Sequence, residues 1–302
     1  FERSTAELRY GVNLTATSNT LSLKKSPTSF HDEEIYKVKP GADLDYTLPI
    51  GKNFGVVLTG VYTQKFNEQN ISRRTWNNAG TATGASVSNP FMQQFLIQDS
   101  PRYTNRSIYS GKADWRITPN SVLTLGSRWG RNVRASTGHT TMTPSAGTVG
   151  TPTPAIGTPF SYGPDFTVGA TGRGAVTVTG GWQYSVDYTT GTNLGYRYDD
   201  GKWKVEAAAN YSHSETYLPS TSIGHFNNVT AVLRDAVRVT FRNIGEERPG
   251  TIEVFNSANQ AVDIYNPANY RVSAATHDDR VHILSSKFAN LDVRRRLDLF
   301  SF

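Results

Sequence analysis

The feature of this sequence that most constrains its fold is a regular alternation of apolar and polar residues along unusually long segments. In residues 109–117, for example, Trp115 and Ile117 share one face, whereas Lys112 and Asp114 fall on the other. A period of two is typical of a β-strand with one dry, apolar face and one wet, polar face. The alternation therefore predicts an all-β, antiparallel protein.

Eight segments carry the pattern, and we expect each to form one strand of an up-and-down sheet. They are residues 5–18, 34–48, 54–66, 106–118, 121–134, 183–199, 202–217 and 281–300. At about 12–16 residues they exceed the five or six that are usual in soluble proteins and the 9–11 needed to cross a bilayer at a tilt. This length favours a transmembrane β-barrel, whose dry face meets lipid.

One charged residue, Arg295, falls on a dry face in the central parts of these strands. An Arg that faces lipid costs about 2–4 kcal/mol at the bilayer midplane and about 0–1 kcal/mol near the interface. Either Arg295 lies at the rim of the membrane, or a bulge near Arg294–Arg296 shifts the phase of the strand. The sequence leaves both explanations open.

The connections between the strands alternate between short and long. The short ones, 49–53, 118–121 and 199–202, contain Pro, Gly or Asn and predict tight turns. The long ones, which we expect to be loops, run over residues 25–33, 67–105, 135–182 and 218–280, and residues 148–159 are close to low complexity. Short turns on one side and long loops on the other are typical of outer-membrane barrels.

Aromatic residues lie towards both ends of the dry faces. Those beside the short turns are Tyr46, Phe54, Trp115, Tyr196, Tyr198 and Trp203, and those nearer the long loops are Tyr62, Phe66, Tyr109, Trp129, Tyr184 and Tyr211. Two such layers are typical of the aromatic girdles at the two membrane interfaces. A large soluble β-sandwich remains the alternative, because a protein core would also keep charge off a dry face.

Composition excludes several classes of protein. The 302 residues include no Cys, so the chain has no disulfides, thiolate metal sites or cysteine nucleophile. The mean hydropathy is −0.47 and no apolar run approaches about 18 residues, which argues against a transmembrane helix. The net charge of +6 comes from bases that are spread along the chain, so we expect no nucleic-acid partner.

No motif for catalysis is present. We find no Walker loop, nucleophile elbow or metalloprotease helix motif, and the six His residues have no ligand spacing. We therefore expect no enzyme activity, no catalytic residues and no cofactor. The segments His31–Glu34 and His277–Asp279 carry oxygen ligands that suit a divalent cation, but charged loop tips have the same composition.

Three stretches of the chain, residues 98–129, 189–217 and 290–302, resemble barrel hairpins of TonB-dependent outer-membrane receptors. The resemblance is one of hairpin style and covers most of the chain, without a diagnostic motif. It implies a location in the bacterial outer membrane. In that family a barrel of about 22 strands encloses an N-terminal plug, and TonB couples transport to an inner-membrane energy source.

This resemblance implies that residues 1–302 form part of a single barrel domain, an interior segment without plug or TonB box. The implied function is energised uptake of a scarce ligand such as a siderophore, cobalamin or an oligosaccharide. The implied partners are outer-membrane lipid, the plug of the same chain, TonB through the plug, and the small-molecule or oligosaccharide ligand. The alternatives are a passive porin, a complete eight-stranded barrel and a soluble β-sandwich binding protein.

Seven residues are candidate ligand contacts on the loops or the wet face: Trp76, Phe91, Tyr103, Arg116, Arg128, Trp129 and Tyr217. The aromatic rings suit stacking on a sugar or a chelate, and the alternative is packing within a girdle or loop. Wet-face charges also occur in opposite pairs, such as Lys112 with Asp114. These pairs either contact the plug or the substrate, or form a cross-strand charge ladder within the wall.

Overall fold

The computed structural model describes residues 5–16, 21–26, 34–79, 83–137, 140–147, 159–235 and 237–297. Within them the chain is antiparallel β-structure, with two single-turn 3-10 helices, η1 (Thr221–Ile223) and η2 (Pro267–Asn269). No helix in this part of the chain is long and apolar enough to span a membrane. The predicted all-β fold class is confirmed.

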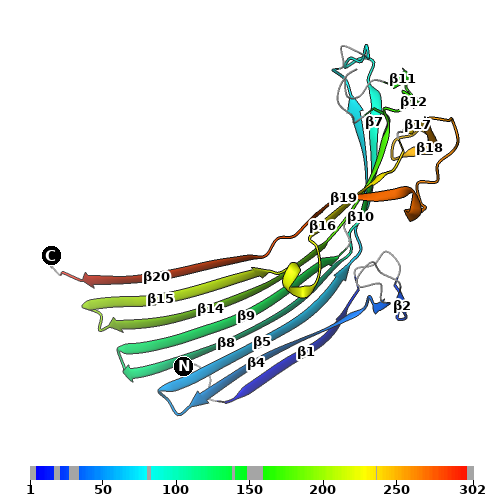
Figure 1. Cartoon of the computed structure of the whole chain (residues 1–302). Helices are drawn as coiled ribbons and strands as arrows, with labels where there is room; N and C mark the ends of the chain where they lie inside the picture. Colours follow the sequence, from blue (N-terminus) through cyan, green and yellow to red (C-terminus); the bar gives the residue numbers. More distant parts are fainter. Residues whose placement is uncertain are drawn as a thin grey trace.

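The eight predicted strands form one sheet in which every strand pairs antiparallel with its neighbours. Its strands, in spatial order, are β1 (Glu7–Thr15), β4 (Lys39–Ile50), β5 (Phe54–Asn67), β8 (Arg102–Thr118), β9 (Ser121–Thr137), β14 (Trp182–Asp199), β15 (Trp203–Leu218) and β20 (Arg280–Arg295). We call this the large sheet; the end with the tight turns is its turn end, and the opposite end is its lobe end (Figure 1). The strand β20 stops at Arg295, and residues 298–302 lie outside the described part of the chain.

The large sheet is open. Its spatial order runs from β1 to β20, and among the described residues these two edge strands do not pair with each other. The closed eight-stranded barrel that the sequence left as an alternative is therefore not the arrangement of this structure.

The predicted long loops are largely not loops, which corrects the sequence analysis. Residues 67–105, 135–182 and 218–280 hold all six strands of a second antiparallel sheet. Its strands, in spatial order, are β6 (Asn70–Asn77), β7 (Phe91–Asp99), β10 (Thr140–Ser145), β13 (Ala175–Gly180), β16 (Asn228–Leu233) and β19 (Tyr270–Thr276). Each of these strands continues one strand of the large sheet after a break in the β-structure. Their spatial order repeats that of the strands they continue (Figure 1).

The breaks explain why the alternating pattern did not reveal this second sheet. Residues 68–69 separate β5 from β6, and residues 100–101 separate β7 from β8. Pro101 has no N–H to donate to a ladder. Gly181 alone separates β13 from β14. Each break interrupts the period of two, so the shorter strands beyond it appear as polar connections.

A third sheet packs against the second. Its strands are β11 (Pro159–Tyr162), β12 (Phe166–Gly169), β17 (Val237–Ile244) and β18 (Pro249–Asn256). Buried apolar side chains join the two sheets: Met92, Phe95, Ala146, Val176, Leu233, Val237, Val239, Phe241, Val254 and Ile264. The second and third sheets together form what we call the lobe, which has a hydrophobic core of its own (Figure 1). A two-stranded ribbon of β2 (Lys25–Ser26) and β3 (Ile35–Tyr36) completes the described strands. Residues 148–158, which belong to the low-complexity segment, lie outside the described part of the chain.

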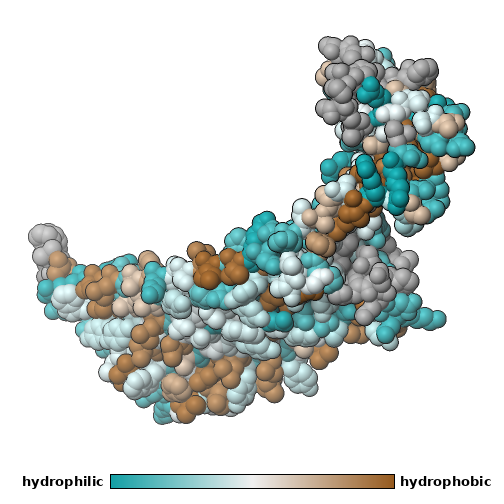
Figure 2. All heavy atoms as spheres, in the orientation of Figure 1, coloured by the Kyte–Doolittle hydropathy of each residue, from teal (hydrophilic) through white to brown (hydrophobic). Residues whose placement is uncertain are grey.

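The large sheet has the opposite character, because most of it is a single layer whose large apolar side chains are exposed. Leu58, Trp115, Leu125 and Leu194 keep 46–50% of their surface accessible. Figure 2 shows apolar side chains gathered on the side of this sheet that faces the viewer. Exposed apolar surfaces of this kind mark faces that interact with a protein partner or with a membrane.

Candidate functional site

The register of the large sheet assigns its two faces. Residues directly opposite each other on neighbouring strands share a face. One row near the turn end is apolar and consists of Phe54, Trp115, Leu123, Tyr196, Ala207 and Leu291. The adjacent row is mostly charged and consists of Arg116, Val122, Arg197, Glu206 and Asp292. The predicted dry and wet faces are thus present as two faces of one sheet.

The aromatic residues of the two predicted girdles all belong to the dry face by register. Tyr109 and Trp129 stack with ring centroids 5.7 Å apart near the middle of β8 and β9. Phe66 differs from the others because it is only 2% exposed. It packs inside the protein rather than against its surroundings.

Arg295 lies at the rim of the dry face. It is the register partner of Trp203, beside a tight turn, and its guanidinium lies 5.0 Å from the centroid of the Trp203 ring. The pairing of β15 with β20 runs without a register shift, so no bulge displaces this residue. Of the two explanations for Arg295, the structure supports the rim.

The register places three more charged residues, Arg131, Glu215 and Lys287, on the dry face, opposite Tyr188, Tyr188 and Tyr211 respectively. Arg131 and Glu215 lie towards the lobe end of their strands, whereas Lys287 lies near the middle of β20. Glu215 accepts a hydrogen bond from the Tyr217 hydroxyl at 2.6 Å and shares a 2.9 Å contact with His213. These three residues were not among the dry-face positions counted from the sequence, so sequence reasoning missed them.

The wet face of the three central strands β5, β8 and β9 is strongly basic. It carries seven basic residues and one acidic residue: Lys65, Arg102, Arg106, Lys112, Arg116, Arg128, Arg134 and the acid Asp114. The flanking strands are mixed in charge. On β1 and β4 the wet-face charges are Glu7, Arg9, Lys39, Asp43 and Asp45, and on β14, β15 and β20 they are Asp187, Arg197, Asp199, Lys204, Glu206, Arg280, Asp292 and Arg294. We call the set on β5, β8 and β9 the basic strip.

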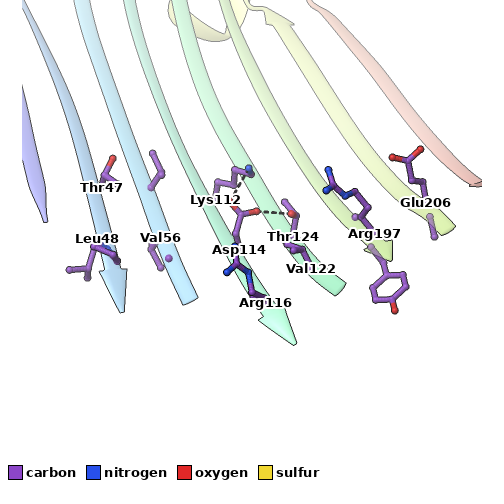
Figure 3. A pocket seen from close by; sticks show the side chains of 16 residues that line it. Thr47, Leu48, Val56, Lys112, Asp114, Arg116, Val122, Thr124, Arg197 and Glu206 are labelled. Carbon is purple, nitrogen blue, oxygen red and sulfur yellow. Dashed lines mark hydrogen bonds and ion pairs between the residues drawn. The ribbon is translucent and has the colours of Figure 1, made fainter. Parts of the chain in front are cut away.

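Three hollows follow the basic strip along the wet face. The first, near the lobe end, has a volume of about 470 Å³ and contains Lys65, Arg106 and Arg128. The second, of about 410 Å³, shares Arg128 with the first and Lys112 with the third. The third, of about 660 Å³, lies near the turn end and spans β4 to β15 (Figure 3). Shared lining residues make the three hollows one continuous groove.

Charges near the turn end of the groove are largely paired. Lys112 lies 2.9 Å from Asp114, which also accepts a 2.6 Å hydrogen bond from Thr124 (Figure 3). Lys204 lies 3.0 Å from Glu206. Both ion pairs join residues two apart on one strand, so they are not the cross-strand charge ladder that the sequence left as an alternative.

The predicted ligand contacts do not converge on one site. Arg116 and Arg128 lie on the wet face and line the groove. Trp129 and Tyr217 lie on the dry face, and Tyr217 meets Tyr188 edge-on at 6.1 Å.

The remaining three aromatic candidates lie elsewhere. Phe91 is fully buried in the lobe, 5.2 Å from the ring of Tyr162, so it cannot stack on a ligand. Trp76 lies on β6 beneath Arg74, and half-buried Tyr103 lies beneath Lys39. The sequence signal that would have found the groove is the concentration of bases on the wet positions of residues 65–134.

The candidate cation segment at His277–Asp279 has its acidic groups engaged by the protein. Asp279 accepts a hydrogen bond from the Ser220 backbone N–H at 2.5 Å, and Asp278 accepts one from Arg280 Nε at 2.7 Å. Among the described residues no cluster of three His or acidic groups could hold a metal ion. Residues 31–33 of the other candidate segment lie outside those residues.

Comparison with protein-family models, curated proteins and solved structures finds no match to this chain. Function is therefore inferred from the two faces of the large sheet, the groove and the lobe.

Proposed function

We propose that this chain is part of the wall of a bacterial outer-membrane barrel that takes up a ligand, of the kind that TonB energises. The observation that carries the proposal is a single-layered sheet with an exposed apolar face, bordered by aromatic residues at both ends. A soluble sandwich would cover that face with a second sheet. Here lipid is the apolar medium that fits it.

The lengths of the strands in the large sheet fit the thickness of a bilayer. At a strand tilt of about 40° and a rise of about 3.3 Å per residue, each residue climbs roughly 2.5 Å, so an apolar band about 25 Å tall takes roughly ten residues. Strands β8, β9, β14 and β15 have 16–18 residues and extend beyond such a band. If Trp203 and Arg295 mark the lower border, Glu215 lies above the upper border and Lys287 reaches it with its long side chain.

The two edge strands of the large sheet support the proposal that it is part of a larger barrel. Backbone groups within the hydrocarbon of a bilayer must all be paired, so a spanning sheet cannot keep open edges. In this proposal further strands of the same barrel pair with β1 and β20. The tight turns face the periplasm, and the lobe faces the outside, where loops of such barrels are long.

The lobe supports a receptor rather than a plain pore. It has its own core, which provides a rigid surface for capturing a ligand outside the membrane. In the proposed mechanism the lobe side captures the ligand, and a plug enclosed by the barrel moves when TonB pulls on it. The ligand then passes along the wet face.

Site-specific labelling tests the lipid-facing surface, and the absence of Cys gives a clean background. Single-cysteine variants Leu194→Cys and Asn193→Cys place one environment-sensitive fluorophore on neighbouring dry and wet positions of β14. After reconstitution into vesicles, we expect lipids with a nitroxide on the acyl chain to quench the label at position 194. Aqueous iodide should quench the label at position 193. Equal quenching of both labels by iodide would refute the membrane model.

A second experiment addresses the energy source. Cells that carry or lack the gene are grown under limitation of iron, cobalamin or a polysaccharide carbon source, with and without a functional TonB. The proposal expects a growth advantage that disappears when TonB is removed. An advantage that persists without TonB would identify a passive porin instead.

A further inference from the structure

The basic strip has more positive charge than the wall around it. Seven of its eight charged residues are basic, whereas the wet-face charges of the flanking strands are nearly balanced. Folding alone does not require this separation, because alternating charges on neighbouring strands would be more stable. Bases gathered on three adjacent strands repel one another unless an anion lies between them.

The unpaired part of the strip lies near the lobe end. Lys65 on β5, Arg106 on β8 and Arg128 on β9 are exposed and line the same hollow of about 470 Å³. Among the described residues none of the three forms an ion pair or a side-chain hydrogen bond. We call these three residues the basic triad.

The acid nearest to the basic triad is already engaged. Asp187 lines the same hollow, but it pairs with Arg134 at 3.1 Å. It also accepts hydrogen bonds from Asn132 at 3.0 Å and Thr216 at 2.8 Å. Asp187 therefore neutralises Arg134 and leaves the triad uncompensated.

We propose that the basic triad binds a compact anion that carries several phosphate or carboxylate groups, and this inference rests on the proposed function, in which the wet face lines the lumen. Guanidinium and ammonium groups form their strongest hydrogen bonds with such oxyanions. A hollow with an excess of positive charge also concentrates anions. Its volume lies within the range of small-molecule sites, about 300–1,000 Å³.

The groove also provides a route for the bound anion. Arg128 lines the first and second hollows, and Lys112 lines the second and third. Arg116 lies at the turn end of the third hollow (Figure 3). An anion leaving the basic triad thus meets Lys112 and Arg116 along β8, in the direction of the tight turns.

Titration of the full-length protein in a non-ionic detergent tests the site. The probes are inorganic pyrophosphate and citrate, with neutral maltotriose as the comparison. We expect both anions to bind, with an affinity that falls as KCl is raised, because salt screens exposed charges. The double variant Arg106→Gln/Arg128→Gln should bind about tenfold or more weakly, since each lost charged hydrogen bond has a large effect.

Matched variants make the result specific. Lys204→Gln removes the same kind of charge from the same face, but Lys204 is paired with Glu206 and lies outside the triad, so its binding should stay within about twofold. Arg106→Lys/Arg128→Lys keeps the charge and should retain most of the affinity. A far-UV circular dichroism spectrum unchanged from that of the original protein verifies that each variant is folded.

Three results would overturn the inference: anion binding that the double Gln variant leaves unchanged, binding of maltotriose in place of the anions, or no binding of either anion. If neither anion binds, protection of the Lys65 amino group from chemical acetylation would identify an acidic protein segment as the occupant of the hollow. The fluorophore experiment separates this failure from that of the proposed function. A label at position 194 that lipid quenches, together with no anion binding, refutes the anion site alone.

Discussion

Gly181 lies at the junction between the large sheet and the lobe, where another part of the backbone approaches it closely. Gly181 lies between β13 and β14, and a Cβ placed there would overlap the backbone carbonyl of Asn227. The carbonyl belongs to the backbone and cannot rotate away as a flexible side chain would. The preceding residue, Gly180, would have no heavy atom within 4 Å of its Cβ.

These neighbouring glycines give a matched prediction. We expect Gly181→Ala to lower the free energy of unfolding by about 1–3 kcal/mol, the usual cost of overpacking, because the chain must shift to accommodate the methyl group. Gly180→Ala should change it by less than about 1 kcal/mol. Denaturant unfolding of the protein in detergent measures both. Equal losses in the two variants would contradict the close approach at Gly181.

The carboxylate of Asp200 stabilises the turn between β14 and β15 in a pH-dependent way. It accepts hydrogen bonds from the backbone N–H of Trp203 at 2.6 Å, the Tyr198 hydroxyl at 2.8 Å and the backbone N–H of Lys202 at 2.9 Å. These donors favour the charged form and lower the pKa of Asp200. A lowered pKa in the folded state stabilises the protein above the ordinary pKa of Asp, and this stabilisation is lost as the pH falls through the folded value.

Replacement of this carboxylate tests the effect. We expect Asp200→Asn to destabilise the protein at neutral pH, and the difference from the original protein to shrink in acid, where Asp200 itself is protonated. Unfolding curves recorded between pH 7 and pH 3 measure it. The control is Asp235→Asn in the lobe, because Asp235 is exposed and accepts no hydrogen bond among the described residues. A difference that stays constant with pH would refute the role of the Asp200 charge.

At the scale of strands, the sequence was informative where one pattern runs unbroken. The eight strands of the large sheet and their two faces followed from alternation, because one face of each strand differs in polarity from the other along most of its length. The six strands of the second sheet were not predicted, because Pro101, Gly181 and similar breaks interrupt that period. The third sheet was not predicted, because all four of its strands have only 4–8 residues. Short segments carry too few residues to define a period.

The candidate site was predicted in part for a related reason. Alternation assigns Arg116 and Arg128 to the wet face, and the structure places both on the groove. It does not give the register between neighbouring strands, so Lys65 and Arg106 were not associated with Arg128. Phe91 was wrong as a ligand contact, because the sequence carries no sign that the segment around it folds into a core.

The polarity of the faces leads to a prediction for substitutions on β5. Leu58 lies on the dry face, four residues from Phe54 at the turn end, and is 46% exposed. In a membrane, we expect Leu58→Arg to destabilise the protein by about 2–4 kcal/mol, the cost of Arg near the bilayer midplane. Unfolding from lipid vesicles by guanidinium chloride measures the change.

The matched control lies on the same strand. Val61 belongs to the wet face, opposite Asp43, so Arg at this position gains an acidic neighbour. Val61→Arg should therefore change the stability by less than about 1 kcal/mol. If Val61→Arg is as harmful as Leu58→Arg, the two faces do not differ in their surroundings.

At the scale of the whole molecule, the chain combines two ways of stabilising β-sheets. The lobe buries apolar side chains between two sheets, as soluble proteins do, whereas most of the large sheet leaves its apolar face uncovered. In the proposed membrane location their stabilities depend on different media: the core of the lobe needs only water around it, and the apolar face of the large sheet is stabilised by lipid. Damage to one need not unfold the other.

Phe241 tests this independence. It is fully buried in the core of the lobe, on β17, and its truncation removes a large apolar contact. We expect Phe241→Ala to destabilise the lobe by about 3–5 kcal/mol. Limited proteolysis of the protein in vesicles should then cut the lobe, while the label at position 194 remains quenched by lipid. The control Tyr265→Ala removes a ring that is 72% exposed and should leave the lobe resistant. Loss of lipid quenching together with cleavage of the lobe would mean that the two parts fold as one cooperative unit.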